Sequence, residues 1–393
     1  MRVDIYGTLG PKCSDEETLT EMFKCGMSGI RLNLSHTTLE QAADRINVYH
    51  AAARRAGIEA KLLIDIQGPE IRIGSLKEEL SLEEGEKVKL VSEVLLKKQN
   101  ALKTEVGKET EKGKETEKGK EAVKGKEVEK EVEKEVEKEV EKETEKEADD
   151  SEKIIPVPEY IFEYIEKGQE ILIDDGKILL EALDKGEKTA DKIEQISCIA
   201  KRGGKLASRK SLALIGKEVK SPTLTKQDKE NLKKAVNYGV TGIMQPFVRN
   251  REDLKNLRNA MKECGCENLK IFAKIENLKG VESLEDFMDL ADEVVIARGD
   301  LGNAMPLWAL PAVQKKISAE CRNRNVPFMV VTQMLASMEK SAVPTRAEVS
   351  DIYNSVLDGA SSVMVTGETA VGDYPVEVIR YLSNTVKEAE KNK

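Results

Sequence analysis

Charged residues in the second half of the sequence have a spacing suited to metal and phosphate chemistry. Lys274 and Glu276 lie two positions apart in a predicted strand, so they share one face of it. The same alternation places Arg298 and Asp300 together in a predicted strand over 294–300. Burying a cation and two carboxylates is costly unless they bind something. Two oxygen ligands beside an ammonium group suit Mg²⁺ and an anionic substrate, and a structural ion-pair network is the alternative.

A second set of polar residues shares one face of a predicted strand near the N-terminus. In GIRLNLSH, Arg31, Asn33 and Ser35 alternate with leucine and isoleucine. Strands that alternate with helices are buried on both faces, so three polar residues in file indicate the mouth of a ligand site. A surface strand is the alternative interpretation. The next predicted strand, LLIDIQG, places Asp65 beside this file.

The elements that position these residues form an alternating strand–helix pattern. Outside an insert, the pattern predicts three strands before it and five after it: 2–9, 29–35 and 62–68, then 241–247, 271–277, 294–300, 327–334 and 361–368. Eight such units make a closed (β/α)8 TIM barrel of the α/β class, which carries its chemistry at the carboxyl ends of its strands. A doubly wound sheet is the alternative, but no glycine-rich fingerprint follows the first strand.

Residues 69–217 interrupt this pattern with short strand-like runs, which predict an inserted all-β domain between barrel segments 1–68 and 218–393. Inside the insert, 97–150 is a low-complexity tract rich in glutamate and lysine. We expect a partly helical, partly disordered loop expansion without a packed core, because Glu and Lys recur four residues apart. A coiled coil that binds an unknown partner is the alternative.

The composition of the 393 residues excludes several classes of protein. Residues 103–150 hold 13 Lys against 19 Asp and Glu and so carry −6 of the net charge of −9, and the nearly neutral remainder argues against a nucleic-acid-binding surface. Two histidines leave little room for histidine-centred triads or metal sites. Six cysteines without disulfide or zinc spacing favour reduced thiols and a cytoplasmic location. We expect no signal peptide and no membrane span.

The sequence resembles the pyruvate kinase family in several stretches that keep the family's order and cover nearly the whole chain outside the tract. These stretches are TLGPKCSDEETLTEMFKCGMSGIRLNLSH, IDIQGPEIRIG, ILIDDG, KIENLKG, ARGDLG, TQMLASM, PTRAEVSDIYNSVLDGA and TGETAVGDYP. The resemblance implies a TIM barrel with a small β-barrel lid inserted after the third strand. The family's usual third domain has no counterpart in this sequence, so its effector control and tetramer are not expected, while a homo-oligomer through the barrel stays open.

The resemblance also implies the substrate side of the site. Phosphoenolpyruvate would be held by its phosphate and its carboxylate, and Mg²⁺ would neutralise the transferring group. The residues implied are Glu276 and Asp300 for Mg²⁺, Lys274 as the electrophile beside the phosphoryl group, Arg31 for the phosphate, and Gly299 and Thr332 for the carboxylate, with Thr332 near the carbon that is protonated.

For the other ligands the resemblance implies a K⁺ site and a nucleotide site. Glu70 is the residue type of K⁺-dependent members, and Arg72 and Lys210 would face the phosphates of ADP or ATP. The K⁺ ligands implied are Asn33, Ser35, Asp65 and the backbone carbonyl of Ile66.

The expected function is therefore pyruvate kinase: phosphoryl transfer from phosphoenolpyruvate to ADP, the last step of glycolysis. Such a reaction needs cations and positioning more than it needs a nucleophile. The sequence departs from the family on the nucleotide side and around K⁺, at Thr37, Gln67, Ser211, Ala213 and Pro246. The alternative is a catalytically weakened relative that binds phosphoenolpyruvate in a regulatory role.

Overall fold

The computed structural model describes residues 2–35, 37–96, 153–174, 176–189, 192–217 and 219–392. The chain divides into two compact units, which we call the barrel unit (Met1–Glu70 with Pro222–Lys393) and the inserted unit (Ile71–Ser221). The charged tract lies outside the described residues, so its helical and coiled-coil interpretations stay predictions. No helix in the described part of the chain has the length and apolar character needed to cross a membrane.

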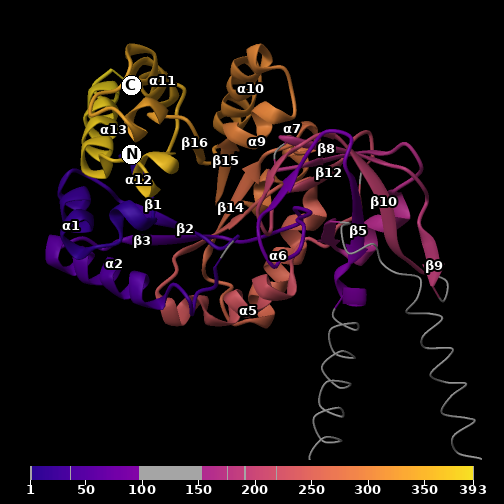
Figure 1. The fold of residues 1–393 in the computed structure, drawn as a ribbon. Helices are drawn as coiled ribbons and strands as arrows, with labels where there is room; N and C mark the ends of the chain where they lie inside the picture. Colours follow the sequence, from indigo (N-terminus) through magenta and orange to yellow (C-terminus); the bar gives the residue numbers. More distant parts are fainter. Residues whose placement is uncertain are drawn as a thin grey trace, which may run out of the picture. The chain divides into compact units, whose positions relative to one another are not determined.

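Eight parallel strands of the barrel unit close on themselves in the order β1-β17-β16-β15-β14-β13-β3-β2 (Figure 1). The predicted (β/α)8 barrel, with three strands before the insert and five after it, is confirmed. The strands are β1 (Asp4–Thr8), β2 (Gly29–Asn33), β3 (Lys61–Asp65), β13 (Gly242–Gln245), β14 (Lys270–Ile275), β15 (Glu293–Ala297), β16 (Phe328–Val331) and β17 (Ser362–Met364).

Helices follow the strands of the barrel unit. Several of them begin where a side chain accepts a hydrogen bond from the backbone of the first turn, as Thr225, Asn250 and Thr345 do. The α-helices are α1 (Glu16–Lys24), α2 (Ala43–Ala56), α5 (Lys226–Ala235), α6 (Arg251–Glu263), α7 (Leu278–Glu282), α8 (Leu284–Phe287), α9 (Arg298–Asn303), α10 (Leu310–Asn323), α11 (Arg346–Leu357), α12 (Gly367–Ala370) and α13 (Pro375–Glu390).

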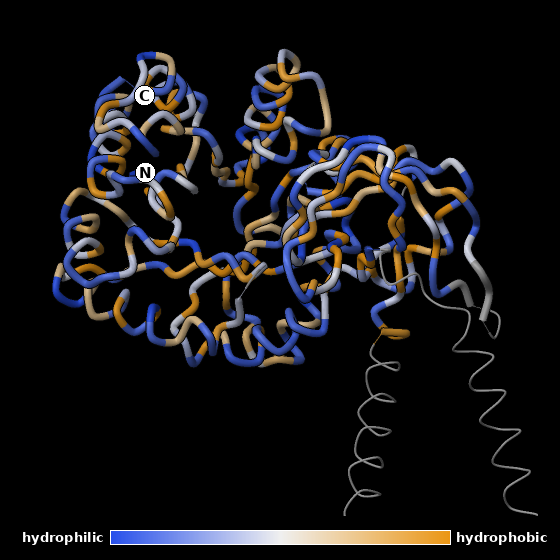
Figure 2. Tube along the Cα trace, in the orientation of Figure 1, coloured by the Kyte–Doolittle hydropathy of each residue, from blue (hydrophilic) through white to orange (hydrophobic). Residues whose placement is uncertain are grey.

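Alternation along the strands separates two apolar layers in the barrel unit. In β14, Ile271, Ala273 and Ile275 belong to the large core that includes helix residues, whereas Phe272 belongs to a small cluster of strand residues inside the barrel. Figure 2 shows hydrophobic residues along the strands and mixed colours along the helices. Lys274 shares the face of Phe272, so its side chain faces the barrel interior.

The inserted unit is all-β, as the strand-like runs predict. Its main sheet has seven strands in the order β12-β7-β8-β10-β5-β6, with β9 paired to β10, and β11 pairs separately with β4. Hydrogen bonds between the described strands do not close this sheet. The strands are β4 (Leu80–Leu82), β5 (Lys87–Ser92), β6 (Lys153–Val157), β7 (Glu170–Ile173), β8 (Ile178–Ala182), β9 (Glu187–Thr189), β10 (Lys192–Arg202), β11 (Gly204–Leu206) and β12 (Leu212–Leu214).

The strand predicted over 294–300 is wrong at its end. Strand β15 stops at Ala297, and helix α9 begins at Arg298. Residues two apart on a helix point in nearly opposite directions, because each residue turns the chain by about 100°. Arg298 and Asp300 therefore do not share a face, contrary to the alternation argument.

Candidate functional site

A buried lysine between two carboxylates forms the centre of the site. The Lys274 ammonium lies 2.9 Å from Oδ2 of Asp65 and 2.9 Å from Oε1 of Glu276. The side chains of Lys274, Asp65 and Glu276 are 12%, 3% and 2% exposed. Asp65 ends β3, and Lys274 and Glu276 lie at the end of β14, so all three come from the carboxyl ends of strands.

Arg31 joins the same cluster from β2. Its Nε and its Nη2 each lie 2.8 Å from Oδ2 of Asp65. Asn33, at the end of β2, is the register partner of Asp65 in β3. The strand register therefore places Asp65 beside the polar residues of β2, as the sequence predicts.

The opposite charges of this cluster stabilise the ionised forms of Asp65 and Lys274. Burial would raise the pKa of Asp65, but the cations of Lys274 and Arg31 outweigh burial and hold that pKa below its ordinary value. Burial would lower the pKa of Lys274, but the carboxylates of Asp65 and Glu276 raise it. Asp65 is therefore ionised and Lys274 protonated at neutral pH.

Glu276 has a different balance of charges. Burial, together with the carboxylates of Asp300 and Asp65, raises its pKa to about 7 despite the opposing effect of Lys274. Its Oε2 accepts a hydrogen bond from the backbone N–H of Phe247 at 2.8 Å. Glu276 and Asp300 are thus close enough to repel each other, and a bound cation would relieve this repulsion.

Arg298 lies in a structural network, in contrast to the predicted pairing with Asp300. Its Nε and Nη2 donate to the backbone carbonyl of Thr332 at 3.2 and 2.8 Å, and its Nη1 lies 2.7 Å from Oδ2 of Asp351 on α11. The guanidinium group thus holds the turn after β16 against helix α11. Asp300 lies in the first turn of α9.

Gly299 and Thr332 are brought together by that turn. A Cβ atom added at Gly299 would lie 3.0 Å from Cγ2 of Thr332, so the absence of a side chain lets α9 approach the end of β16. Thr332 has a φ of +81° and Gln333 a φ of +55°. Such values are costly for residues other than glycine and are concentrated at functional sites in proteins.

The residues expected around K⁺ lie next to the cluster. Oδ1 of Asp65 is buried and has no hydrogen-bond partner among the described residues. The Asn33 side-chain oxygen accepts from the N–H of Ser35 at 3.0 Å, and Ile66 is 1% exposed. A buried carboxylate oxygen without a donor fits a cation ligand, because burying such an oxygen alone is costly.

No ready-made site of three acidic, histidine or cysteine side chains occurs within the described ranges. A divalent ion on the barrel unit would therefore rest on the two carboxylates of Glu276 and Asp300, and substrate oxygens would have to complete its coordination. Glu70 is half-buried at the end of the first segment of the barrel unit.

Arg72 and Lys210 lie in the inserted unit, where they flank one short ladder. Arg72 pairs with Ser211 in an isolated bridge, and its Nη1 donates to the backbone carbonyl of Arg209 at 2.9 Å. The Lys210 ammonium lies 2.9 Å from Oδ1 of Asp174, whose pKa stays low because Lys210 and Lys177 outweigh burial. The bridge therefore brings the backbone of Arg72 next to the segment that carries Lys210.

The turn after β13 holds residues that sequence reasoning missed. The backbone N–H of Phe247 reaches Glu276, and Arg249 pairs with the buried Asp253 of α6. The sequence signal for this turn is weak, since a phenylalanine at a φ of +50° is not expected from its residue type. Asp253 is an acidic residue in the first turn of α6, where carboxylates favour the helix dipole, and this position is its sequence signal.

Sequence comparisons with known proteins agree on one family. The sequence model of the pyruvate kinase barrel domain matches residues 1–108 and 99–379. A pyruvate kinase of Lachancea kluyveri is 32% identical over 99% of this chain and 68% of its own length. A pyruvate kinase of Chlamydia pneumoniae is 31% identical over 100% of this chain and 69% of its own length. One from Staphylococcus saprophyticus is 30% identical, and the matched part is 57% of its length.

Proposed function

Because the chain belongs to the pyruvate kinase family, we propose that it transfers the phosphoryl group of phosphoenolpyruvate to ADP and releases pyruvate and ATP. The observation that carries the proposal is the Lys274 ammonium held 2.9 Å from both Asp65 and Glu276 at the end of the barrel strands. A fixed cation in a buried site stabilises developing negative charge at little reorganisation cost.

Arg31 and the turn after β16 are assigned to the two ends of the substrate. Arg31 is pre-oriented by Asp65 and supplies a guanidinium group for the substrate phosphate. Gly299 and Thr332, which the close approach of α9 to the end of β16 brings together, are assigned to the carboxylate.

The reaction breaks the bond between the phosphorus and the enol oxygen of phosphoenolpyruvate, and it forms a bond to a terminal phosphate oxygen of ADP. The electron pair stays on the enol oxygen, where the Lys274 ammonium stabilises the enolate. The enolate carbon then takes one proton, which gives pyruvate. Thr332 is assigned to the neighbourhood of that carbon because it follows the end of β16.

Two cations fit this site. Glu276 and Asp300 would hold Mg²⁺, and the high pKa of Glu276 reflects buried acidic groups that a divalent ion would relieve. Asn33, Ser35, Asp65 and the carbonyl of Ile66 would hold K⁺, and the buried Oδ1 of Asp65, which has no partner among the described residues, supports this assignment. When bound, Mg²⁺ neutralises charge on the transferring group and on the enolate oxygen.

The nucleotide is assigned to Arg72 and Lys210 of the inserted unit, which we propose to act as a lid that excludes water during transfer. The bridge between Arg72 and Ser211, the neighbour of Lys210, supports this assignment because it brings two basic residues into adjacent segments. Glu70 is assigned to K⁺ dependence. The six cysteines are free thiols, which supports a cytoplasmic location.

The test is pyruvate formation from phosphoenolpyruvate by the purified chain with Mg²⁺. ADP, GDP and UDP are compared, and K⁺ is exchanged for Na⁺. The proposal expects turnover with at least one nucleoside diphosphate and a loss of rate in Na⁺. Calorimetric binding of phosphoenolpyruvate without turnover under any of these conditions would support the regulatory alternative instead.

A further inference from the structure

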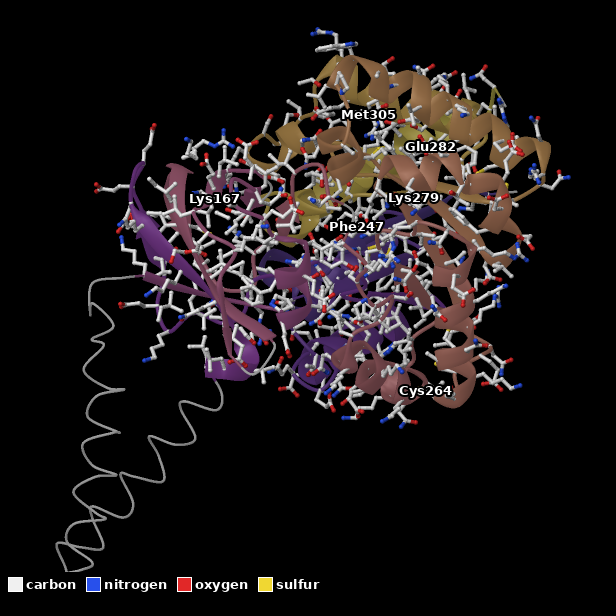
Figure 3. The ribbon with its side chains drawn as sticks, turned by 90° about the vertical axis from the view of Figure 1, so that its right-hand side faces the viewer. Lys167, Phe247, Cys264, Lys279, Glu282 and Met305 are labelled. Carbon is white, nitrogen blue, oxygen red and sulfur yellow. The ribbon has the colours of Figure 1, made fainter. Side chains whose placement is uncertain are left out.

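Phe247 has a strained backbone conformation and contacts the proposed metal ligand Glu276 through its backbone N–H. Its φ is +50°, a left-handed value that bulky side chains rarely adopt. In this conformation its N–H donates to Oε2 of Glu276 at 2.8 Å, while Oε1 of Glu276 meets Lys274. Phe247 is labelled in Figure 3, together with Lys279 and Glu282 of the nearby helix α7. The strained residue thus fixes the one carboxylate oxygen that Lys274 does not contact.

Strain of this kind persists only where neighbouring groups hold it. In the described part of the barrel unit, positive φ values outside glycine occur at Phe247, Thr332, Gln333 and Asn325. Asn325 belongs to a residue type that adopts this conformation readily. The first three follow β13 and β16, two of the strands whose ends surround the site.

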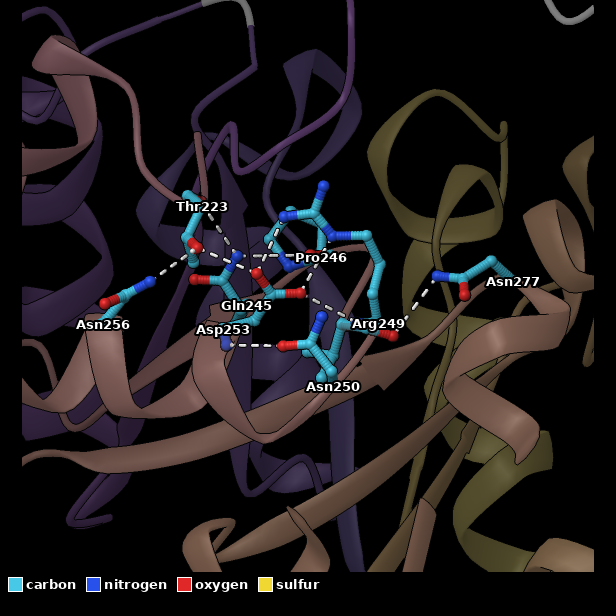
Figure 4. Close-up of polar contacts among 9 residues, drawn as sticks. Thr223, Gln245, Pro246, Arg249, Asn250, Asp253, Asn256 and Asn277 are labelled. Atoms are coloured by element: carbon cyan, nitrogen blue, oxygen red, sulfur yellow. Dashed lines mark hydrogen bonds and ion pairs between the residues drawn. The ribbon is translucent and has the colours of Figure 1, made fainter. Parts of the chain in front are cut away.

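The first restraint on the turn comes from helix α6. Asp253 is 2% exposed, and its Oδ2 accepts from the backbone N–H of Arg249 at 2.9 Å and from Arg249 Nε at 3.0 Å. Its Oδ1 accepts from Arg249 Nη2 at 2.8 Å and from the Thr223 hydroxyl at 2.8 Å (Figure 4). Although burial raises the pKa of Asp253, Arg249 outweighs burial, so the carboxylate stays ionised and the fork intact.

The second restraint comes from helix α7. Asn277 caps this helix by accepting from the N–H of Gly280 at 2.7 Å, and its Nδ2 donates to the backbone carbonyl of Val248 at 3.3 Å. A Cβ atom at Gly280 would lie 2.4 Å from that same carbonyl, so glycine is required for the close approach. The N–H of Val248 also donates to the carbonyl of Lys274 at 3.2 Å.

We propose that the turn from Pro246 to Asn250 positions Glu276 for its divalent cation, with Asp253 and Asn277 as the positioning residues that hold the turn from either side. This inference rests on the proposed function, since it concerns the same carboxylate. Groups that orient a metal ligand typically contribute 10–100-fold to metal affinity.

The test measures Mn²⁺ binding by the electron paramagnetic resonance signal of free Mn²⁺, with phosphoenolpyruvate present and no nucleotide, so that no turnover occurs. Asp253→Asn removes the charged partner of Arg249, and we expect about 10–100-fold weaker binding. Asn277→Ser keeps a capping oxygen for α7 but removes the donor to Val248, and we expect a smaller, several-fold loss. In both variants, deuterium exchange of peptides covering 244–250 should become faster.

Two matched controls separate positioning from general destabilisation. Asp289→Asn breaks an exposed fork that links α6 to the short 3-10 helix Met288–Leu290, in which Arg251 Nη1 and Nη2 lie 2.6 and 2.8 Å from the Asp289 carboxylate. Leu257→Ala creates a cavity at a fully buried position of α6 that lies outside residues 246–250. Both controls should bind Mn²⁺ as the wild-type chain does, although Leu257→Ala melts at a lower temperature.

The outcomes distinguish this inference from the proposed function. Wild-type affinity in folded Asp253→Asn and Asn277→Ser would overturn the positioning role and leave the function standing. Equal losses in Leu257→Ala would also overturn it, since stability alone would explain them. If Asp253→Asn does not fold, Asn277→Ser decides. Failure of the wild-type chain to bind Mn²⁺ would overturn both the metal site and the inference.

Discussion

Glu276 is the residue whose charge depends most directly on its surroundings. Burial and the neighbouring carboxylates raise its pKa from 4.5 to about 7. The pKa of Asp65, in contrast, lies below its ordinary value of 3.8, so Asp65 stays ionised. A divalent cation binds the ionised carboxylate. We therefore predict that Mg²⁺ affinity falls as the pH is lowered through about 7 and that Mg²⁺ binding below this pH releases a proton. Titration calorimetry in two buffers of different ionisation enthalpy measures both effects.

The same shift affects the stability of the barrel unit without metal. A carboxyl group whose pKa is higher in the folded state stabilises the fold below about 4.5, and that contribution is lost as the pH rises to about 7. Asp65 adds no slope in this window because it titrates lower. Chemical denaturation of wild type and Glu276→Gln should show a steeper loss of stability with pH in the wild type. Parallel curves would contradict this prediction.

At this scale the sequence predicts the central side chains well but misses their backbone support. Strand alternation predicts that Lys274 and Glu276 share a face, and strand register places Asp65 beside the polar residues of β2, but the contact between Asp65 and Lys274 was not predicted. Phe247 could not be found in this way, since its role belongs to an amide in a left-handed turn. Only tertiary contacts from two helices maintain that conformation.

At the scale of elements, Arg298 of helix α9 holds the turn after β16 in place. Arg298→Lys should lose the two-pronged contact with the Thr332 carbonyl and the Asp351 pair. A shift of the turn by about 1 Å is expected to lower kcat about 100-fold. Steady-state kinetics measures this loss.

Arg324→Lys is the matched control, because Arg324 pairs with Glu320 and Glu285 near the surface. It should leave kcat unchanged. Equal kinetics in Arg298→Lys and wild type would show that the guanidinium group does not position Thr332.

Element boundaries explain why the sequence placed Arg298 wrongly. The run EVVIARGDLG is continuously apolar from Val294 to Ala297, and nothing in its residue types marks the change to a helix at Arg298. The backbone turns there because the strand reaches the end of the barrel. Asp300 nevertheless couples to Glu276, so the predicted neighbours were right although the predicted strand end was wrong.

At the scale of the whole molecule, the charged tract connects two neighbouring strands of the inserted unit. Strands β5 and β6 pair in parallel, so the chain must cross back from the end of one to the start of the other. Deleting residues 100–148 leaves seven residues (93–99) and four residues (149–152) for this crossing. Such a connection spans up to roughly 36 Å, against roughly 17 Å for a five-residue strand.

We therefore predict that this deletion leaves the unfolding cooperativity and turnover nearly unchanged. Differential scanning calorimetry and the pyruvate assay check the prediction. A deletion extended to 93–152 serves as the control, because it removes the connection that a parallel pair requires. A large loss of cooperativity in the shorter deletion would contradict the interpretation of the tract as a loop expansion.

The most direct measurement of the central claim compares pyruvate formation from phosphoenolpyruvate and ADP by the wild-type chain and by Lys274→Met. The variant leaves the buried Glu276 carboxylate without its cationic partner, while Asp65 keeps Arg31, so about 3–5 kcal/mol of stability is lost as well. Rates are therefore compared at a temperature where circular dichroism shows both proteins folded. We predict measurable wild-type turnover and a variant kcat lower by at least about 1,000-fold, since among the described residues only Lys274 places an ammonium beside both Asp65 and Glu276. Equal rates in the two folded proteins would contradict it.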